Sequence, residues 1–178
     1  MLHGKRVNLI VAMDPNGLIG KQNNLPWPRI RADMNWFKRH TERRAVLMGR
    51  MTWESIPKKY RPLPDRENIV LSRDPTYLAD GAVVKTSFKY AIKEASNDYV
   101  YVIGGREIYK LALPFADILV VSHIGLPFDG DVYFPEYDKS EWRCTKAPEA
   151  LPIHNCATDS GIVIPVCFAI YYRIRAAP

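Results

Sequence analysis

The sequence predicts one α/β domain over residues 1–178, built on a mixed, mostly parallel sheet with helices on both faces and an antiparallel C-terminal hairpin. Three observations support this prediction. Short runs rich in Val, Ile and Leu alternate with segments of helical periodicity, as in parallel α/β sheets. No repeat or Ser/Gly-rich linker divides the 178 residues. Apolar residues at 47% and charged residues at 25% are ordinary globular usage, which argues against a disordered or fibrous chain.

Six strands are expected from their apolar, β-branched composition. Several are almost continuous in Val, Ile and Leu, as expected for strands covered on both faces. The expected strands are residues 7–13, 45–48, 68–72, 82–84, 99–103 and 118–124.

Helices are expected between these strands. The first is indicated by Ile30, Met34 and Phe37, which repeat at i, i+4 and i+7, with Pro28 at an early helical position. The others are residues 52–56, 87–95 and 106–113, the last stopped by Pro114.

The C-terminal part has a different pattern. Residues 141–147 and 163–174 predict the two strands of an antiparallel hairpin that completes the sheet. The stretch 148–165 has no assigned role and is expected to be a surface loop.

Net charge, targeting signals and cysteine spacing limit the partners and the compartment expected for the protein. The net charge of +6 suits an anionic partner but is equally typical of a solvated surface. The apolar runs 7–13 and 162–172 are too short for a signal peptide core or a membrane span of roughly 20 residues. The three cysteines form no CxxC pair and no metal-ligand spacing with the histidines. We therefore expect a cytoplasmic protein with reduced thiols, no metal site and no membrane association.

A carboxylate on the first expected helix is the first candidate for chemistry. Asp33 lies near the face that carries Met34 and Phe37. It is either an ordinary first-turn carboxylate stabilised by the helix dipole or a partly buried acceptor for two parallel N–H donors of a planar heterocycle. Burial of the charge is tolerated only when such donors are present.

Two strand-to-helix turns are suited to phosphate groups. In residues 48–56, backbone N–H groups, the Arg50 guanidinium and the Thr52 hydroxyl favour an anion, although a plain Thr N-cap explains the pattern equally well. In residues 102–109, Gly104 and Gly105 permit close approach of a ligand, although such pairs are commonly structural. Together with the carboxylate helix, these turns favour a nucleotide-dependent enzyme.

Taken in order, eight segments between residues 7 and 135 resemble dihydrofolate reductases. They are Ile10-Val11-Ala12, Gly17-Leu18-Ile19-Gly20, Leu25-Pro26-Trp27, Asp33 with Trp36-Phe37-Lys38, Met48-Gly49-Arg50 with Thr52-Trp53-Glu54-Ser55-Ile56, Arg61-Pro62-Leu63-Pro64 with Arg66-Glu67-Asn68, Val102-Ile103-Gly104-Gly105 with Ile108-Tyr109, and Gly130-Asp131 with Phe134-Pro135. Their order and spacing make the combination specific. The tail after Trp142 matches only in general pattern.

The resemblance implies NADPH-dependent reduction of 7,8-dihydrofolate to tetrahydrofolate. Asp33 would hold the pterin 2-amino group and N3 and favour protonation at N5, while hydride passes from nicotinamide C4 to pterin C6. Leu25 matches the family's mobile segment over the nicotinamide, and Trp27 lies next to that segment. Tyr109 matches the tyrosine near the contact between the pterin and nicotinamide rings. Diaminopyrimidine antifolate inhibitors are expected to exploit Asp33.

The remaining site residues are implied by the same resemblance. Arg66 would clamp the glutamate α-carboxylate, and Ser122 stands where the family usually has a Thr that supports the aspartate. The apolar pocket around the pterin and aminobenzoyl rings would be Ile10, Val11, Met34, Phe37, Ile56, Leu63 and Ile103. The cofactor-binding residues would be Ala12, Ile19, Gly20, Gly49, Arg50, Met51, Thr52, Leu71, Ser72, Arg73, Lys85, Gly104, Gly105, Arg106, Ile108 and Tyr109, with Arg50 and Arg73 favouring NADPH over NADH.

Two other functions compete with this interpretation. NADPH-dependent reductases of ribosylated pyrimidines in riboflavin synthesis share the fold, but Asp33 and Arg66 favour folate. A basic nucleic-acid-binding module would use residues 29–31 with 38–44, which more simply solvate the first helix. A monomer is expected, because no long exposed apolar element suggests an obligate interface.

Overall fold

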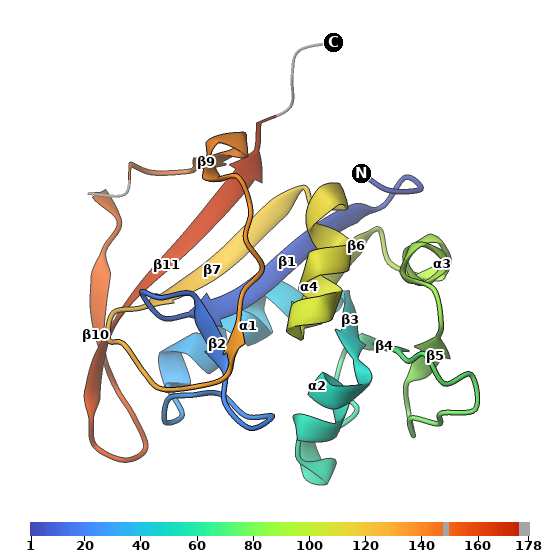
Figure 1. Cartoon of the computed structure of the whole chain (residues 1–178), viewed down its shortest axis with the longest axis horizontal. Helices are drawn as coiled ribbons and strands as arrows, with labels where there is room; N and C mark the ends of the chain where they lie inside the picture. Colours follow the sequence, from blue (N-terminus) through green and yellow to red (C-terminus); the bar gives the residue numbers. More distant parts are fainter. Residues whose placement is uncertain (148–149, 175–178) are drawn as a thin grey trace.

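The computed structural model describes residues 1–147 and 150–174. Within these residues the centre of the molecule is a nine-stranded sheet (Figure 1). Its order is β10 (Ile153–Ala157), β11 (Val163–Arg173), β7 (Ile118–Ile124), β1 (Arg6–Met13), β6 (Tyr99–Gly104), β3 (Ala45–Gly49), β4 (Glu67–Leu71) and β5 (Val83–Lys85). The ninth strand, β9 (Trp142–Cys144), pairs with one end of β11, and a separate small sheet joins β2 (Leu18–Gly20) to β8 (Val132–Tyr133).

The strand directions confirm the expected mixed sheet. Every neighbouring pair from β7 to β5 is parallel. The strand β11 runs antiparallel to β7, to β9 and to β10. The parallel part therefore places the carboxyl ends of its strands along one edge, which is where α/β sheets bind ligands.

Helices cover both faces of the sheet. They are α1 (Arg31–Thr41), α2 (Arg50–Ser55), α3 (Phe88–Glu94) and α4 (Arg106–Ala112), with single 3₁₀ turns at Lys58–Tyr60, Leu113–Phe115 and Lys139–Glu141. Alternate strand residues point to opposite faces. Leu9 and Leu47 join the largest core cluster with α3 and α4, whereas Val46 and Met48 pack with Trp53 of α2 on the other face. A third cluster joins Trp27 and Ile30, just before α1, to the β7–β11 part of the sheet.

The first helix begins later than the sequence predicts. Ile30 is its N-cap, with an extended backbone, so Pro28 lies before the helix and not in its first turn. The cause is tertiary: Ile30 is 2% exposed in the third cluster and forms a backbone bridge to Thr158. Pairing with a segment more than a hundred residues away holds this part of the chain extended.

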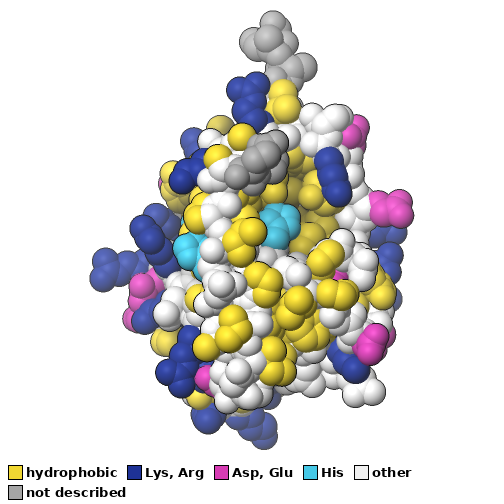
Figure 2. Space-filling view, turned by 90° about the vertical axis from the view of Figure 1, so that its left-hand side faces the viewer, with side chains coloured by type: hydrophobic (Ala, Val, Ile, Leu, Met, Phe, Trp, Pro, Cys, Tyr) yellow, Lys and Arg dark blue, Asp and Glu magenta, His cyan; other side chains and the backbone are white. Residues whose placement is uncertain are grey.

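The C-terminal region is more ordered than expected. The predicted hairpin is present, since β9 pairs with β11. However, the presumed loop 148–165 carries β10, which pairs with the other half of β11, while Pro148 and Glu149 lie outside the described residues. Figure 2 views this edge of the molecule, where hydrophobic side chains lie on the surface; Ile153 is 71% and Val163 is 55% exposed. Cys156, buried against Ile164, fixes the strand.

The sequence analysis did not foresee β2 and β8, which are too short to show a periodic pattern. No helix of the described residues is long and apolar enough to cross a membrane.

Candidate active site

An opening between β1 and β6 lies at the carboxyl edge of the sheet. The β1–β6 ladder ends at the pair Leu9 and Val102, whereas the β1–β7 ladder continues to Met13 and His123. Beyond that point the Tyr109 hydroxyl of α4 donates a hydrogen bond to the Ile10 carbonyl (2.7 Å). Backbone groups two residues apart on a strand point the same way, so those of Ala12 also face the opening.

The acidic group of the opening is Asp33, in the first turn of α1. It is 9% exposed, and a side-chain hydrogen bond joins it to the buried Ser122 of β7. Burial raises the pKa of the Asp33 carboxyl, and the hydrogen bond with Ser122 partly opposes that shift. Within residues 1–147 and 150–174 no cation forms an ion pair with it. The carboxylate is therefore left with acceptor capacity for the N–H groups of a ligand.

Tyr109 lies close to this carboxylate. It is buried, and burial followed by the nearby negative charge of Asp33 raises the pKa of its phenol. The hydroxyl thus stays protonated and acts as a donor to Ile10.

The segment that contains Leu25 borders the opening and is held by two aspartates. Asp131 accepts from the Gln22 N–H, and its own N–H donates to the Gly20 carbonyl (3.1 Å). Buried Asp14 accepts from the Leu18 and Phe128 N–H groups and so ties both loops together. These bonds hold residues 14–25 against residues 125–131.

Two side chains of this segment differ in burial. Leu25 is 50% exposed, whereas Trp27 is 5% exposed and packs edge-on against Phe128 at 5.8 Å between ring centroids. The Trp27 Nε1 group is buried without a hydrogen-bond partner among the described residues, which leaves a donor for a ligand or a water.

Asp33 and Arg66 lie near the two ends of α1. Asp33 and Thr41 are eight residues apart, which is about 12 Å of helix, and Arg66 contacts Thr41 at 2.9 Å. Met34 and Phe37 lie on the helix between them. Ile56, Leu63 and Ile103 pack around the Trp53 cluster on the same face of the sheet. The side chain of Val11, by contrast, packs in the core of the opposite face, and its backbone lies in the ladder with Val121 of β7, so Val11 does not line the opening as the resemblance implied.

Two glycine turns adjoin the opening. Gly49 is the N-cap of α2 and Gly105 that of α4, so the alternative of a Thr52 N-cap is wrong. A Cβ on Gly49 would lie 3.0 Å from Ile108, and one on Gly105 would lie 3.4 Å from the Thr52 hydroxyl. The contact at 49 is tighter than ordinary packing, whereas the one at 105 is an ordinary van der Waals contact, so close packing favours glycine at 49.

Basic side chains lie beyond the turns, at the ends of β3 and β4. Arg50 stacks over the Tyr77 ring at 5.5 Å and approaches Glu54 at 3.8 Å. Ser72 accepts from the Asp74 N–H, and Arg73 is exposed. Lys85, a further expected cofactor residue, places its ammonium group 2.7 Å from Glu94.

The remaining expected cofactor residues are placed as follows. Ile19 is partly buried against the large core and Gly20 ends β2. Met51 is 56% exposed on α2, and Leu71 pairs in register with Gly49. Arg106 is exposed at the start of α4.

Sequence reasoning missed three polar residues around the site. Asp14 and Thr41 are buried and act through hydrogen bonds to distant segments, which no local pattern reveals. Tyr77 supports Arg50 from a loop, and its only local signal is an aromatic residue in a polar stretch.

An opening at the carboxyl ends of parallel strands, two glycine turns beside it and a buried, unpaired carboxylate define an α/β enzyme that uses a nucleotide cofactor. The sequence model described as "Dihydrofolate reductase" matches residues 6–163. This chain belongs to the dihydrofolate reductase family, and it is an oxidoreductase.

Individual relatives agree with this assignment. The dihydrofolate reductase of Bacillus subtilis (strain 168) is 40% identical over 144 residues, which are 80% of this chain and 83% of the relative. That of Staphylococcus haemolyticus is 34% identical over 171 residues, covering 96% and 97%. A solved structure of the Enterococcus faecalis enzyme, complexed with NADP(H) and RAB-propyl, superposes with a TM-score of 0.82 at 31% identity and covers 98% of this chain and 99% of its own.

Proposed function

We propose that this chain reduces 7,8-dihydrofolate to 5,6,7,8-tetrahydrofolate with NADPH. The observation that carries the proposal is the buried Asp33 carboxylate, which faces the opening with Ser122 as its hydrogen-bond partner and has no ion pair within the described residues. A planar pterin, which offers its 2-amino group and N3 as parallel donors, satisfies such a carboxylate. The solved relative is described as a complex with NADP(H).

The residues around the opening fit a dinucleotide. Gly49, Gly104 and Gly105 keep the two turns free of side chains, while the Ala12 backbone and the Thr52 hydroxyl offer polar groups. Arg50 and Arg73 are suited to the phosphates, including the 2′-phosphate that distinguishes NADPH from NADH. Bound NADPH supplies the hydride, which passes from nicotinamide C4 to pterin C6.

Asp33 orients the pterin and favours its protonation at N5. The two hydrogen bonds fix the ring in one plane, and the negative charge favours the protonated ring. The proton reaches N5 from water. Tyr109 and the Ile10 carbonyl border the contact between the two rings.

The Gly20–Leu25 segment covers the nicotinamide side of the opening. Asp131 and Gly20 anchor its first half to residues 125–131. Closure of this segment excludes water from the reacting rings and gates turnover.

The tail of the substrate lies along α1. Met34, Phe37, Ile56 and Leu63 contact the aminobenzoyl ring, and the Arg66 guanidinium binds the α-carboxylate. Diaminopyrimidine antifolates present an amidine-like edge to Asp33 and compete with the substrate for this carboxylate. The enzyme acts as a monomer in the cytoplasm, an environment in which its three free cysteines stay reduced.

The test is NADPH oxidation with and without dihydrofolate, by wild type and by Asp33→Asn. We expect dihydrofolate-dependent turnover, which Asp33→Asn lowers at neutral pH at least a hundredfold, with little recovery in acid. NADPH binding without turnover of dihydrofolate would contradict the folate assignment and favour a pyrimidine substrate.

A further inference from the structure

We propose that Thr41, in the last turn of α1, is the positioning residue that orients Arg66 toward the terminal carboxylate of the substrate. This inference rests on the proposed function, in which Arg66 binds that carboxylate. Nothing in the sequence around Thr41 points to such a role, because the contact joins residues 25 positions apart.

The guanidinium of Arg66 is held on three sides. Its Nε–H donates to the Thr41 hydroxyl oxygen (2.9 Å), and its Nη1–H donates to the Pro64 carbonyl (2.7 Å). Its central carbon lies 5.7 Å from the centroid of the Phe37 ring. The contacts come from α1 and from the loop before β4, so they fix the position of the guanidinium between two elements.

Thr41 is itself fixed by its helix. Its hydroxyl donates to the Phe37 carbonyl (2.8 Å), one turn earlier in α1, and its side chain is fully buried. Because the hydroxyl proton is committed to Phe37, the oxygen lone pairs face Arg66. The threonine is thus an oriented acceptor and not a freely rotating hydroxyl.

These contacts decide which edge of the guanidinium is free. An arginine can bind a carboxylate side-on through Nε and Nη2 or end-on through Nη1 and Nη2. Thr41 uses Nε, and Pro64 uses one hydrogen of Nη1. Within the described residues Nη2 makes no hydrogen bond and Nη1 keeps one hydrogen, so these two nitrogens remain for the carboxylate of the substrate.

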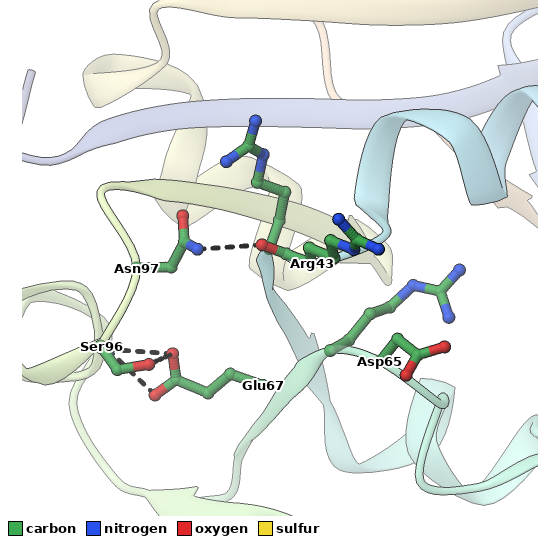
Figure 3. Close-up of a pocket in the computed structure, with 7 residues that line it drawn as sticks. Arg43, Asp65, Glu67, Ser96 and Asn97 are labelled. Carbon is green, nitrogen blue, oxygen red and sulfur yellow. Dashed lines mark hydrogen bonds between the residues drawn. The ribbon is translucent and has the colours of Figure 1, made fainter.

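The main chain of Arg66 is fixed independently of Thr41. The Arg43 N–H donates to the Asp65 carbonyl (2.7 Å), and the Glu67 N–H donates to the Arg44 carbonyl (3.1 Å). Side chains of this region line a polar pocket of about 250 Å³ (Figure 3), where Asn97 donates to the Arg43 carbonyl and Ser96 to the Glu67 carboxylate. Loss of the Thr41 hydroxyl therefore frees the Arg66 side chain without moving its backbone.

Two carboxylates compete for the guanidinium once it is free. Burial lowers the pKa of Arg66, and the charges of Glu42 and Asp65 raise it, so both carboxylates lie within electrostatic range. Neither forms an ion pair with Arg66 in the described part of the chain. Holding Nε at Thr41 keeps the guanidinium against α1 and away from these two carboxylates.

The experiment compares two substrates in Thr41→Val, which keeps the shape but removes the hydroxyl. We expect KM for dihydrofolate to rise about tenfold, as for the loss of a hydrogen bond to a charged group, with kcat changed less than about twofold. KM for 6-methyl-7,8-dihydropterin, which has no tail carboxylate, should stay within about twofold of wild type. Thr41→Ser, which restores the hydroxyl, should recover most of the affinity for dihydrofolate.

Two controls separate this inference from the proposed function. Arg66→Leu should raise KM for dihydrofolate and not for the pterin; if it does not, the proposed carboxylate clamp is wrong. If Arg66→Leu raises KM for dihydrofolate as expected but Thr41→Val leaves that KM unchanged, the role of Thr41 is overturned. An equal rise for both substrates in Thr41→Val would show a merely structural effect and would also overturn it.

Two further variants keep the test decisive. Thr145→Val removes an exposed threonine hydroxyl after β9, which donates to the Ile170 carbonyl, and should leave both KM values unchanged. If Thr41→Val does not accumulate as folded protein, Thr41→Cys replaces it, since a thiol is a weak acceptor and should produce the same selective rise in KM.

Discussion

At the scale of single residues, burial of the Asp33 carboxyl lowers the stability of the ligand-free protein when the group is ionised, although the proposed function needs it there. Because burial raises its pKa above the ordinary 3.8, the native state holds its proton more tightly than the unfolded state does. The free energy of unfolding therefore falls as the pH rises from about 4 through the raised pKa, and the stabilising contribution is lost above it. Once ionised, the Asp33 carboxylate is a buried charge that forms no ion pair within the described residues.

Asp33→Asn should therefore be more stable than wild type at pH 7.5, by on the order of 1 kcal/mol in urea denaturation without ligand, and the gain should shrink toward pH 4. Asp74→Asn is the matched control. That exposed carboxylate has a lowered pKa because Thr76 donates to it, so neutralising it should give no gain at pH 7.5. A less stable Asp33→Asn at pH 7.5 would show that the charge is not destabilising.

Much of the residue-scale chemistry is visible in the sequence, and the remainder depends on long-range contacts. Asp33 stands out because a carboxylate beside apolar helix positions is unusual, and the glycine turns stand out by composition. Thr41 and Asp14 show no such signal, because their partners are Arg66 and Phe128, which only the fold brings to them. The acceptor role of a buried polar residue cannot be inferred before its donor is placed.

At the scale of elements, the segment 125–131 acts as a rigid support for β2. A Cβ added to Gly130 would lie 2.5 Å from the Gly20 carbonyl and 2.7 Å from a Leu18 methyl carbon. The contact with the carbonyl is backbone, so a side chain at 130 must displace β2 or the loop. The loop anchor at Asp131 is the next residue.

Gly130→Ala should lower stability by about 1–3 kcal/mol, as for overpacking, and should lower kcat because the Gly20–Leu25 segment loses its support. Hydrogen exchange at the Gln22 N–H, which donates a hydrogen bond to Asp131, should become faster. Gly4→Ala is the control, because a Cβ there meets nothing within 4 Å and the substitution carries only the cost of φ +77°. Unchanged kcat and exchange in Gly130→Ala would show that the loop is not anchored there.

The elements also show where local patterns fail. The buried parallel strands were predictable, since runs such as Ile118–Val121 and Val46–Met48 are apolar throughout. The strand β10 was not, because Ile153–Ala157 is mostly exposed and has only Cys156 buried. Its existence depends on pairing with β11, and that pairing is a property of the fold rather than of the segment.

At the scale of the whole molecule, one continuous sheet lies between three core clusters, so the clusters should unfold together. The four tryptophans report on them: Trp142 lies in the largest cluster, Trp27 in the one before α1, Trp53 in the one under α2, and Trp36 stacks on Phe168 of β11 at 5.0 Å. The parallel strands β1 and β6 contribute to more than one of these clusters through their two faces.

We expect urea unfolding followed by single-tryptophan fluorescence at positions 27, 53 and 142 to give coincident midpoints, equal to the midpoint by circular dichroism. NADPH at about 100 times its Kd should raise the free energy of unfolding by about 2.7 kcal/mol and shift all midpoints together, because it binds only the folded sheet edge. An earlier midpoint for Trp27 alone would show that the β10–β11 part unfolds separately. A midpoint shift confined to Trp53 would show that the nucleotide stabilises only the α2 side of the sheet. The sheet would then not unfold as one cooperative unit.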